Sequence, residues 1–262
     1  MVDTTFLHKQ IPALGRRVHR VGLSAGFGLT EAGIAAAFEA GLQYVFWNPT
    51  ARTLTRALQK LTPAQRDRLV IATGPSFGFF PGSVRRHVER CLKVLKTERL
   101  DVLQLYWLGR MSAWRGPVVD EMVRLKEEGK VGALGVSIHD RERAGALAKD
   151  GPLDVLMIRY NAAHPGAERD IFPHLQTRQP AVVAYTATSW RRLLKPPSGW
   201  TGPVPTAGDC YRFCLSSPHV DIVLMGPKDE DQLVNNLTVL ERGPLSAQEM
   251  TFMRTFGAAV HG

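Results

Sequence analysis

Four side chains of this sequence are suited to proton transfer, and each stands near the end of a short apolar run. They are Tyr106, Arg159, His139 and His164. A phenol has an ordinary pKa near ~10, so Tyr106 needs a neighbouring cation or hydrogen bond to give up its proton near neutrality. Arg159 is the most suggestive neighbour, because an arginine at the end of a buried strand requires a partner or an anionic ligand. Both histidines could act as general acids or bases, so we predict an acid–base site with these four catalytic candidates.

The same residues also have structural interpretations. Tyr106 could cap a buried core with its hydroxyl bonded to the backbone, and either histidine could be a loop residue bonded to a carbonyl. Glu168 opens a helix-like segment and could cap it or pair with Arg159. Asp140 is expected to cap the helix that follows it. The sequence leaves the catalytic and the structural interpretations open.

Metal and nucleophilic chemistry have no supporting pattern. The chain has three cysteines, Cys91, Cys210 and Cys214, and none forms a metal-type pair. We expect them to be reduced and buried, as in a cytoplasmic protein. No His-Glu-x-x-His motif is present, so we expect no metal site. Ser137 and His139 are two residues apart at a strand end and do not face each other as a nucleophile and its base would.

Length and composition indicate one globular domain over residues 1–262. Hydrophobic residues make up 44% and charged residues 22% of the chain, and the formal net charge is +9. The basic residues are scattered, so we expect no nucleic-acid partner and a small-molecule substrate instead. The sequence shows no signal peptide and no run of ~20 apolar residues, so we expect no membrane partner and a cytoplasmic location. The oligomeric state is not predicted.

Strand-like and helix-like patterns alternate along the chain. The predicted strands are 20–25, 43–47, 69–73, 100–108, 133–137, 155–160, 181–186 and 221–225. The predicted helices are 30–40, 54–61, 83–95, 118–128, 140–149, 168–175, 206–215, 229–240 and 246–259, with N-caps at Thr30 and Ser83 among them.

This alternation predicts an α/β fold, a (β/α)8 TIM barrel of a single domain. A doubly wound open sheet is the alternative, but Gly22, Gly26 and Gly28 do not form the phosphate-binding pattern expected after its first strand. The segment 6–18 precedes the first strand and could form a hairpin that closes the bottom of the barrel. Strand ends at the C-terminal face of such a barrel line the active site. We therefore expect Trp47, Asn48, Trp107 and Asn161 to line a substrate pocket.

The order of several short motifs resembles the aldo-keto reductases over nearly the whole chain. The matching segments are 14–15 and 18–23 (LG and VHRVGL), 40–44 (AGLQY), 100–105 (LDVLQL), 129–131 with 134–137 (GKV and LGVS), 159–161 (RYN), 183–185 (VAY), and 225–227 (MGP) followed by Gln232, Leu233 and Asn236. The resemblance implies a barrel that reduces carbonyl compounds with NADPH.

What the resemblance implies for the site is mixed. The family's catalytic Asp, Tyr, Lys and His are all missing. The Asp aligns near Phe46 and Trp47, the Lys at Gly74 and the His at Tyr106, and residues 49–55 offer no Tyr. Of the residues that hold the nicotinamide, Ser137 and Tyr185 are retained, whereas Ile138 and Met157 replace an Asn and a Gln. The pattern that binds the adenine end is matched by Gly226, Lys228, Gln232 and Asn236.

Three functional hypotheses remain. The first is an NADPH-dependent carbonyl reductase in which Tyr106 donates the proton, helped by Arg159 or His139. The second is a cofactor-independent isomerase, lyase or cyclase that uses Tyr106, Arg159 and His164. The third is a pseudoenzyme that binds a nucleotide or a partner protein. The fold by itself does not decide among them.

Overall fold

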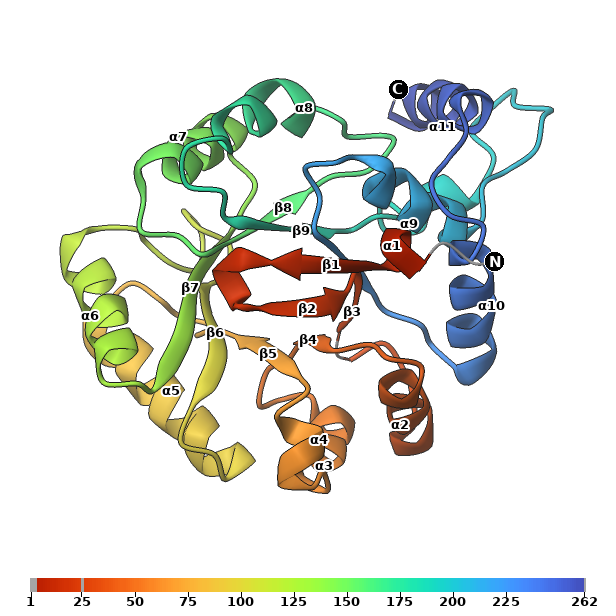
Figure 1. Cartoon of the computed structure of the whole chain (residues 1–262). Coiled ribbons are helices and arrows are strands. Elements are labelled where there is room, and N and C mark those ends of the chain that lie inside the picture. Colours follow the sequence, from red (N-terminus) through yellow and green to blue (C-terminus); the bar gives the residue numbers. More distant parts are fainter. Residues whose placement is uncertain (1–3, 25, 262) are drawn as a thin grey trace.

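A closed barrel of eight parallel strands forms the centre of the molecule (Figure 1). The computed structural model describes residues 4–24 and 26–261. Around the barrel the strands follow one another in chain order, and the last pairs with the first. They are β3 (Val21–Ser24), β4 (Tyr44–Phe46), β5 (Val70–Thr73), β6 (Leu100–Leu105), β7 (Val131–Ile138), β8 (Val155–Arg159), β9 (Ala181–Tyr185) and β10 (Ile222–Met225). The predicted TIM barrel is confirmed.

Helices surround the barrel and cover the outer face of its strands (Figure 1). They are α2 (Glu31–Glu39), α3 (Arg52–Gln59), α4 (Pro63–Arg66), α5 (Pro81–Leu95), α6 (Gly116–Glu127), α7 (Arg141–Asp150), α8 (Ala167–Asp170), α9 (Ala207–Ser216), α10 (Glu230–Leu240) and α11 (Ala247–His261). Short 3-10 turns cover Pro12–Leu14, Phe172–His174 and Arg192–Leu194. Among the described residues, no helix has the length and apolar character needed to cross a membrane.

Strand residues alternate between the barrel interior and the helical layer. Tyr44, Val102, Val155, Val183 and Leu224 belong to the inner apolar cluster. The residues between them along the strands pack outward against the helices in the larger core. This alternation decides which strand-end side chains point into the mouth of the barrel.

An antiparallel hairpin closes the N-terminal end of the barrel. It consists of β1 (His8–Ile11) and β2 (Arg16–His19), which follow the short helix α1 (Thr4–Leu7). Ile11 and Val18 pack against the inward-facing residues at the starts of the strands. The predicted hairpin is therefore confirmed, and the open end of the barrel is the C-terminal one.

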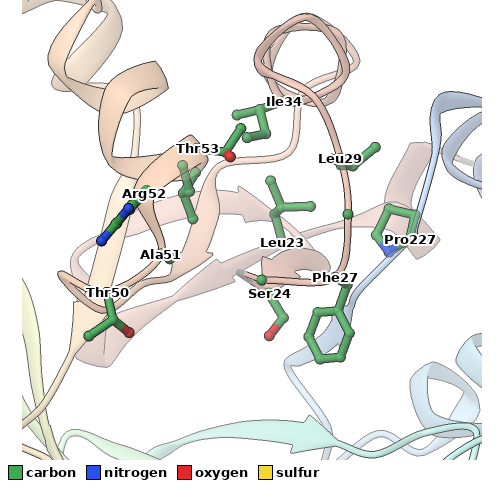
Figure 2. Close-up of a pocket in the computed structure, with 13 residues that line it drawn as sticks. Leu23, Ser24, Phe27, Leu29, Ile34, Thr50, Ala51, Arg52, Thr53 and Pro227 are labelled. Carbon is green, nitrogen blue, oxygen red and sulfur yellow. The ribbon is translucent and has the colours of Figure 1, made fainter.

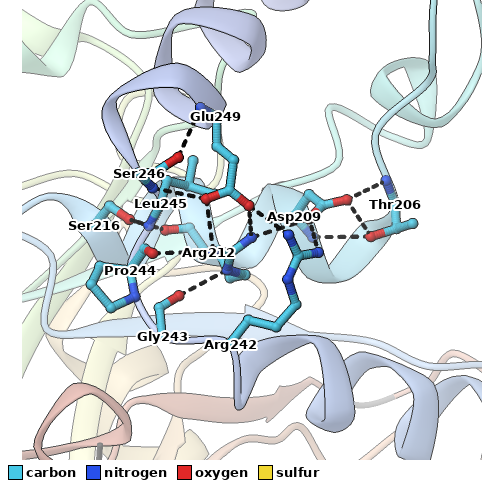
Figure 3. Close-up of polar contacts among 10 residues, drawn as sticks. All are labelled: Thr206, Asp209, Arg212, Ser216, Arg242, Gly243, Pro244, Leu245, Ser246 and Glu249. Atoms are coloured by element: carbon cyan, nitrogen blue, oxygen red, sulfur yellow. Dashed lines mark hydrogen bonds and ion pairs between the residues drawn. The ribbon is translucent and has the colours of Figure 1, made fainter.

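A buried arginine ties α9 to the segment that leads into α11 (Figure 3). The side chain of Arg212 is 2% exposed and donates to the carbonyl oxygens of Gly243 and Pro244. Its guanidinium also binds both carboxylate oxygens of Glu249, at 2.7 and 3.1 Å. Arg242 pairs with the same carboxylate from the solvent side at 2.6 Å. These bonds satisfy the buried charge and hold the last helix against the barrel.

Element boundaries differ from the sequence predictions by a few residues. The strand predicted over 100–108 ends at Leu105, so Tyr106 and Trp107 stand in the loop after β6. Ala25 lies outside the described residues. Ser83 is not an N-cap, because α5 begins at Pro81 and the Ser83 hydroxyl donates back to the carbonyl of Phe80. The cap at Thr30 is confirmed. The predicted cap at Asp140 is confirmed as well.

The three cysteines are free and buried, as predicted.

Candidate active site at the barrel mouth

A cavity of about 330 Å³ opens at the C-terminal end of the barrel. Five strands contribute their last inward-facing or adjoining residues to it: Ser24, Phe46, Met157, Tyr185 and Leu224. The loop after β9, the loop after β10 and α9 complete the wall with Thr186, Ala187, Thr188, Trp190, Arg191, Gly226 and Tyr211, and Phe27 lines it from the loop after β3. The cavity lies where barrel enzymes place their chemistry.

A second cavity of about 300 Å³ adjoins the first (Figure 2). Ser24 and Phe27 line both cavities, and in Figure 2 their side chains point to the same side. Its far wall comes from α2 and from the start of α3, with Thr50 and Arg52 as polar residues. The two cavities are thus neighbours, with Ser24 and Phe27 between them.

Tyr185 and His139 form a hydrogen-bonded pair at the mouth. The Tyr185 hydroxyl lies 2.7 Å from His139 Nε2. Burial raises the pKa of Tyr185 to about 12, while the charge of Arg159 and a hydrogen bond with Ser137 oppose the rise. Desolvation, and then the charges of Arg159 and Arg110, lower the pKa of His139. A neutral imidazole bonded to a phenol can give or accept a proton at this position.

Arg159 lies beside this pair. Its neighbour on β9 in the strand register is Tyr185, and both side chains follow the inward-facing alternation. On the other side of β8, Ile138 of β7 is paired with Ile158. His139, the next residue, therefore lies level with Arg159. The hydrogen bond between Tyr185 and His139 therefore spans the strand that carries Arg159. Three of the predicted site residues are thus brought together.

Tyr106 is placed differently from its predicted role. Its hydroxyl donates to the backbone carbonyl of Trp47 at 3.2 Å, and its ring lies 5.3 Å from that of Phe46. Burial raises the pKa of Tyr106, with opposing hydrogen bonds from Thr73 and the Gly74 backbone. This is the arrangement expected of a residue that caps the core. Proton donation by Tyr106 requires the bond to Trp47 to break.

His164 and Asn161 form a second polar group on the loop after β8. His164 Nδ1 lies 3.1 Å from Asn161 Oδ1, and desolvation lowers the pKa of His164 to about 4. Asn161 is fully buried, donates to the carbonyl of Thr186 and accepts from the amide of Ala163. These bonds hold the loops after β8 and β9 together. The structure thus places Asn161 in the packed interior and not on a pocket wall.

The expected pocket residues of β4 and β6 also occupy different environments. Trp47 is 0% exposed, and its indole donates to Thr55 in the outer core, because its side chain points away from the barrel interior. Asn48 accepts from the backbone and the hydroxyl of Thr50. Trp107 is 40% exposed, and its ring lies 5.5 Å from that of His139. Of these residues, Trp107 alone stands beside the Tyr185–His139 pair.

The expected pair of Glu168 with Arg159 is not formed. Glu168 accepts from the Tyr160 hydroxyl at 2.6 Å and from Arg254 at 2.8 Å. Tyr160 points outward into the larger core, away from the mouth. Glu168 therefore holds α11 against the loop after β8.

Gly74, the residue after β5, has no room for a side chain. A Cβ atom at Gly74 would lie 1.8 Å from the carbonyl oxygen of Gln104 and 3.0 Å from the Tyr106 ring. Beneath it, the amide atoms of Gln104 and the hydroxyl of Tyr44 are buried without a hydrogen-bond partner in the part of the chain that the structure describes. Sequence reasoning missed both residues, although the alternation along β4 and β6 points them into the barrel.

The four residues that match the adenine-binding pattern lie on α10 and on the loop that leads into it. Gly226 lies against Phe27, whose ring would be 2.5 Å from a Cβ atom there. The Gln232 side chain accepts from the Lys228 amide at 3.1 Å, and Lys228 Nζ lies 3.4 Å from Asp229. Asn236 is 9% exposed and donates to the sulfur of Met225. These side chains already have partners within the protein.

The residues present suit the nicotinamide end of a dinucleotide cofactor better than its adenine end. The cavity lined by Ser24 and Tyr185 offers an aromatic ring against which a flat ring can pack, whereas the Phe27 ring covers Gly226. The start of α10 carries three consecutive carboxylates, Asp229, Glu230 and Asp231, against the single cation of Lys228. Negative charge there opposes a 2′-phosphate. No cluster of three or more potential metal ligands occurs among residues 4–24 and 26–261.

Comparisons with known proteins identify the family of this chain. The model of the aldo/keto reductase family matches residues 30–193. The aldo-keto reductase YhdN of Bacillus subtilis (strain 168) is 24% identical over 130 residues, which cover 46% of this chain and 39% of the relative. The aldo-keto reductase AKR11C1 of Bacillus halodurans matches over 95% of both chains at 19% identity, with a TM-score of 0.78 in its holo form and 0.77 in its apo form. The chain belongs to the aldo/keto reductase family.

Proposed function

We propose that the protein is a carbonyl reductase of the aldo-keto reductase type that uses a nicotinamide cofactor, NADPH by the family resemblance. The observation that carries the proposal is the cavity at the barrel mouth. Its wall includes Tyr185, Ser24 and Gly226, and Gly226 lies in the loop that leads to the helix matching the cofactor pattern. Family membership supports an oxidoreductase. The substrate would be a small molecule, and three free cysteines fit a cytoplasmic location.

The chain's own residues would hold both reactants at the mouth. When bound, the nicotinamide would supply a hydride to a carbonyl carbon. Tyr185 would stack on the flat ring, with Ser137 beside it, and Lys228 would lie at the adenine end. The Tyr106 hydroxyl would turn from the Trp47 carbonyl and donate its proton to the carbonyl oxygen. Trp107 and Phe46 would exclude water from the substrate side.

A cofactor titration tests this proposal. Trp107 and Trp190 are exposed at the mouth, so bound cofactor should quench tryptophan fluorescence and show energy transfer to the reduced nicotinamide. Saturable binding of NADPH or NADH, with turnover on a panel of aldehydes and ketones, is the expected result. No binding at millimolar cofactor would overturn the proposal. Binding without turnover would favour a nucleotide-binding pseudoenzyme.

A second function is favoured by one specific arrangement. The hydrogen-bonded His139 and Tyr185 lie beside Arg159, whereas the family's lysine position, Gly74, cannot take a side chain. This combination supports acid–base chemistry without a cofactor, of the isomerase, lyase or cyclase kind. The neutral imidazole of His139 would take a proton from carbon, and Arg159 would stabilise the negative charge that develops.

Solvent deuterium exchange separates the two functions. In D₂O without cofactor, NMR would follow the loss of the proton next to the carbonyl of phenylpyruvate and of acetophenone. Exchange above the rate without protein, lost in His139→Asn and in Tyr185→Phe, is the result expected for the second function. Background exchange with both compounds would overturn proton abstraction from these two compound classes and leave the reductase as the supported function.

A further inference from the structure

Arg159 is a half-buried cation without a counter-ion at the mouth. In the part of the chain that the structure describes, its side chain makes no hydrogen bond and no ion pair. It ends β8 and lies next to Tyr185 in the register of the sheet. A guanidinium that is partly shielded from water is stable when several of its five N–H donors make hydrogen bonds to acceptors. The acceptors for Arg159 must therefore come from outside these residues.

The carboxylates on the nearest loops are committed elsewhere. Glu168 binds Tyr160 and Arg254, as described above. Asp170 pairs with Arg141 and with Arg169 at 2.7 and 2.6 Å. Asp140 accepts the Arg143 amide as the N-cap of α7. None of these carboxylates turns to Arg159, so the positive charge at the mouth remains uncompensated.

The other groups around Arg159 do not neutralise it. The charge of Arg159 contributes to lowering the pKa of both His139 and His164, so both imidazoles are neutral near pH 7. Arg110 adds a second positive charge near His139. A site with one free guanidinium, neutral donors and a further cation favours an anion. The planar fork of arginine matches a carboxylate with two parallel hydrogen bonds.

The surroundings also indicate what the anion is attached to. The Trp107 ring stands against the His139 ring, and the Tyr185 ring continues into the cavity lined by Met157 and Phe46. These aromatic and apolar walls suit a flat apolar body. The exposed Trp107 is held at this position with a φ of 39°, in the left-handed region that a tryptophan rarely adopts.

We propose that Arg159 and the Tyr185 hydroxyl form a carboxylate-binding subsite, and that the natural substrate is an aromatic or similarly apolar carboxylic acid. The carboxylate lies on the guanidinium, and the apolar body lies between Trp107 and the cavity at the centre of the mouth. The inference rests on the proposed function only in placing the active site at this end of the barrel. It holds for either reaction, because it concerns recognition of the substrate.

Binding of benzoate and of benzamide tests the subsite, because the two probes differ in charge and hardly in shape. Titration calorimetry without cofactor should show benzoate binding about tenfold more tightly than benzamide, as expected for charge-assisted hydrogen bonds. Arg159→Gln should abolish that preference and leave benzamide binding unchanged. The matched control Arg110→Gln removes a cation that lies 5.3 Å from the Trp107 ring and should keep most of the preference.

A measurement on the unaltered protein covers the case in which Arg159→Gln fails to fold. Proton NMR of the His139 ring should show that saturating benzoate raises the pKa of His139, because the bound anion offsets the charge of Arg159. Benzamide should leave that pKa in place. Equal affinity for the two probes, or an unmoved His139 pKa with benzoate bound, would overturn the subsite. Neither measurement needs a nicotinamide, so failure of cofactor binding and failure of the subsite are separate outcomes.

Discussion

The backbone of Gln104 occupies the space that a side chain at Gly74 would need, with its carbonyl oxygen 1.8 Å from the position of a Cβ atom. Gly74 follows β5 and Gln104 belongs to β6, and they lie at the same level of the barrel because Thr73 is paired with Leu103. Because the obstacle is backbone and not the end of a flexible side chain, it cannot give way without separating the strands. The absence of a side chain at position 74 is therefore required by the packing of the barrel wall.

We predict that Gly74→Ala destabilises the protein by at least about 3 kcal/mol, the upper end of the usual cost of overpacking. Gly74→Lys should destabilise it at least as much and should not raise its reductase activity. Urea unfolding followed by circular dichroism measures both. Gly82→Ala is the matched control, because nothing lies within 4 Å of a Cβ atom at Gly82. A Gly74→Ala protein as stable as this control would show that the two strands can separate.

Removal of the Tyr106 hydroxyl separates its structural role from its catalytic one. Tyr106→Phe loses one hydrogen bond to the Trp47 carbonyl, which should cost about 1 kcal/mol of stability. If Tyr106 is the proton donor, turnover should also fall about 10²-fold or more. Tyr44→Phe is the control, because its buried hydroxyl has no partner among the described residues, and its loss should leave stability unchanged or raised. Full turnover by Tyr106→Phe would end its role as the donor.

Stability should fall as the pH is lowered from about 6.5 to 4 because of buried histidines. His19 is 4% exposed, and desolvation lowers its pKa from 6.5 to about 4. Between these values the unfolded chain binds a proton that the folded protein does not, so acid favours unfolding. The full difference is about 3 kcal/mol, reached near pH 4. His19→Asn keeps an acceptor for the Val21 amide and should flatten this dependence.

Urea unfolding at several pH values would measure the effect of His19. The exposed His174 provides the comparison, and His174→Asn should leave the pH dependence as it is. An equally steep loss of stability in His19→Asn would assign the acid sensitivity to other groups, of which His87 and His164 are the first candidates. The pKa of each is lowered to about 4, mainly by desolvation.

The buried ion pair of Arg212 should be far more important for stability than its exposed neighbour. Arg212→Met removes bonds to two carbonyls and to Glu249, and should cost about 3 kcal/mol or more. Arg242→Met removes an ion pair with the same carboxylate. Because the Arg242 side chain is 56% exposed, this substitution should cost less than about 1 kcal/mol of stability. Thermal and urea unfolding compare the two. Equal costs would show that Glu249 and not the buried guanidinium organises this contact.

The barrel was predictable because its signals are local. Each of the eight strands is a short apolar run, and the predicted runs overlap β3 to β10 in order. The glycine and capping signals placed most helix ends within a few residues. The exceptions have local causes. For example, the strand predicted to end at residue 108 ends at Leu105, because the Trp107 backbone is left-handed.

For the candidate site, the sequence indicates which strand ends carry its residues but not which contacts these residues make. Arg159 and Tyr185 are paired in the register of β8 and β9, and strand alternation directs both side chains inward. The side chain of Trp47 faces outward, which follows from the same alternation along β4. The hydrogen bond between Tyr185 and His139 joins residues 46 positions apart, and no pattern in the sequence predicts it. The obstruction at Gly74 likewise depends on the spacing of two strands.

The charge at the start of α10 leads to a prediction about the choice of cofactor. Lys228 is the only cation among residues 226–236; it pairs with Asp229, and Glu230 and Asp231 follow in the sequence. If Lys228 binds a 2′-phosphate, Lys228→Ala should weaken NADPH about threefold or more and leave NADH nearly unchanged, as expected for one exposed charge pair. Asp231→Asn is the opposing variant and should strengthen NADPH relative to NADH, because it removes a negative charge from the same helix turn. Fluorescence titrations with both cofactors give the two ratios. Equal weakening of NADPH and NADH by Lys228→Ala would exclude a 2′-phosphate role for this lysine.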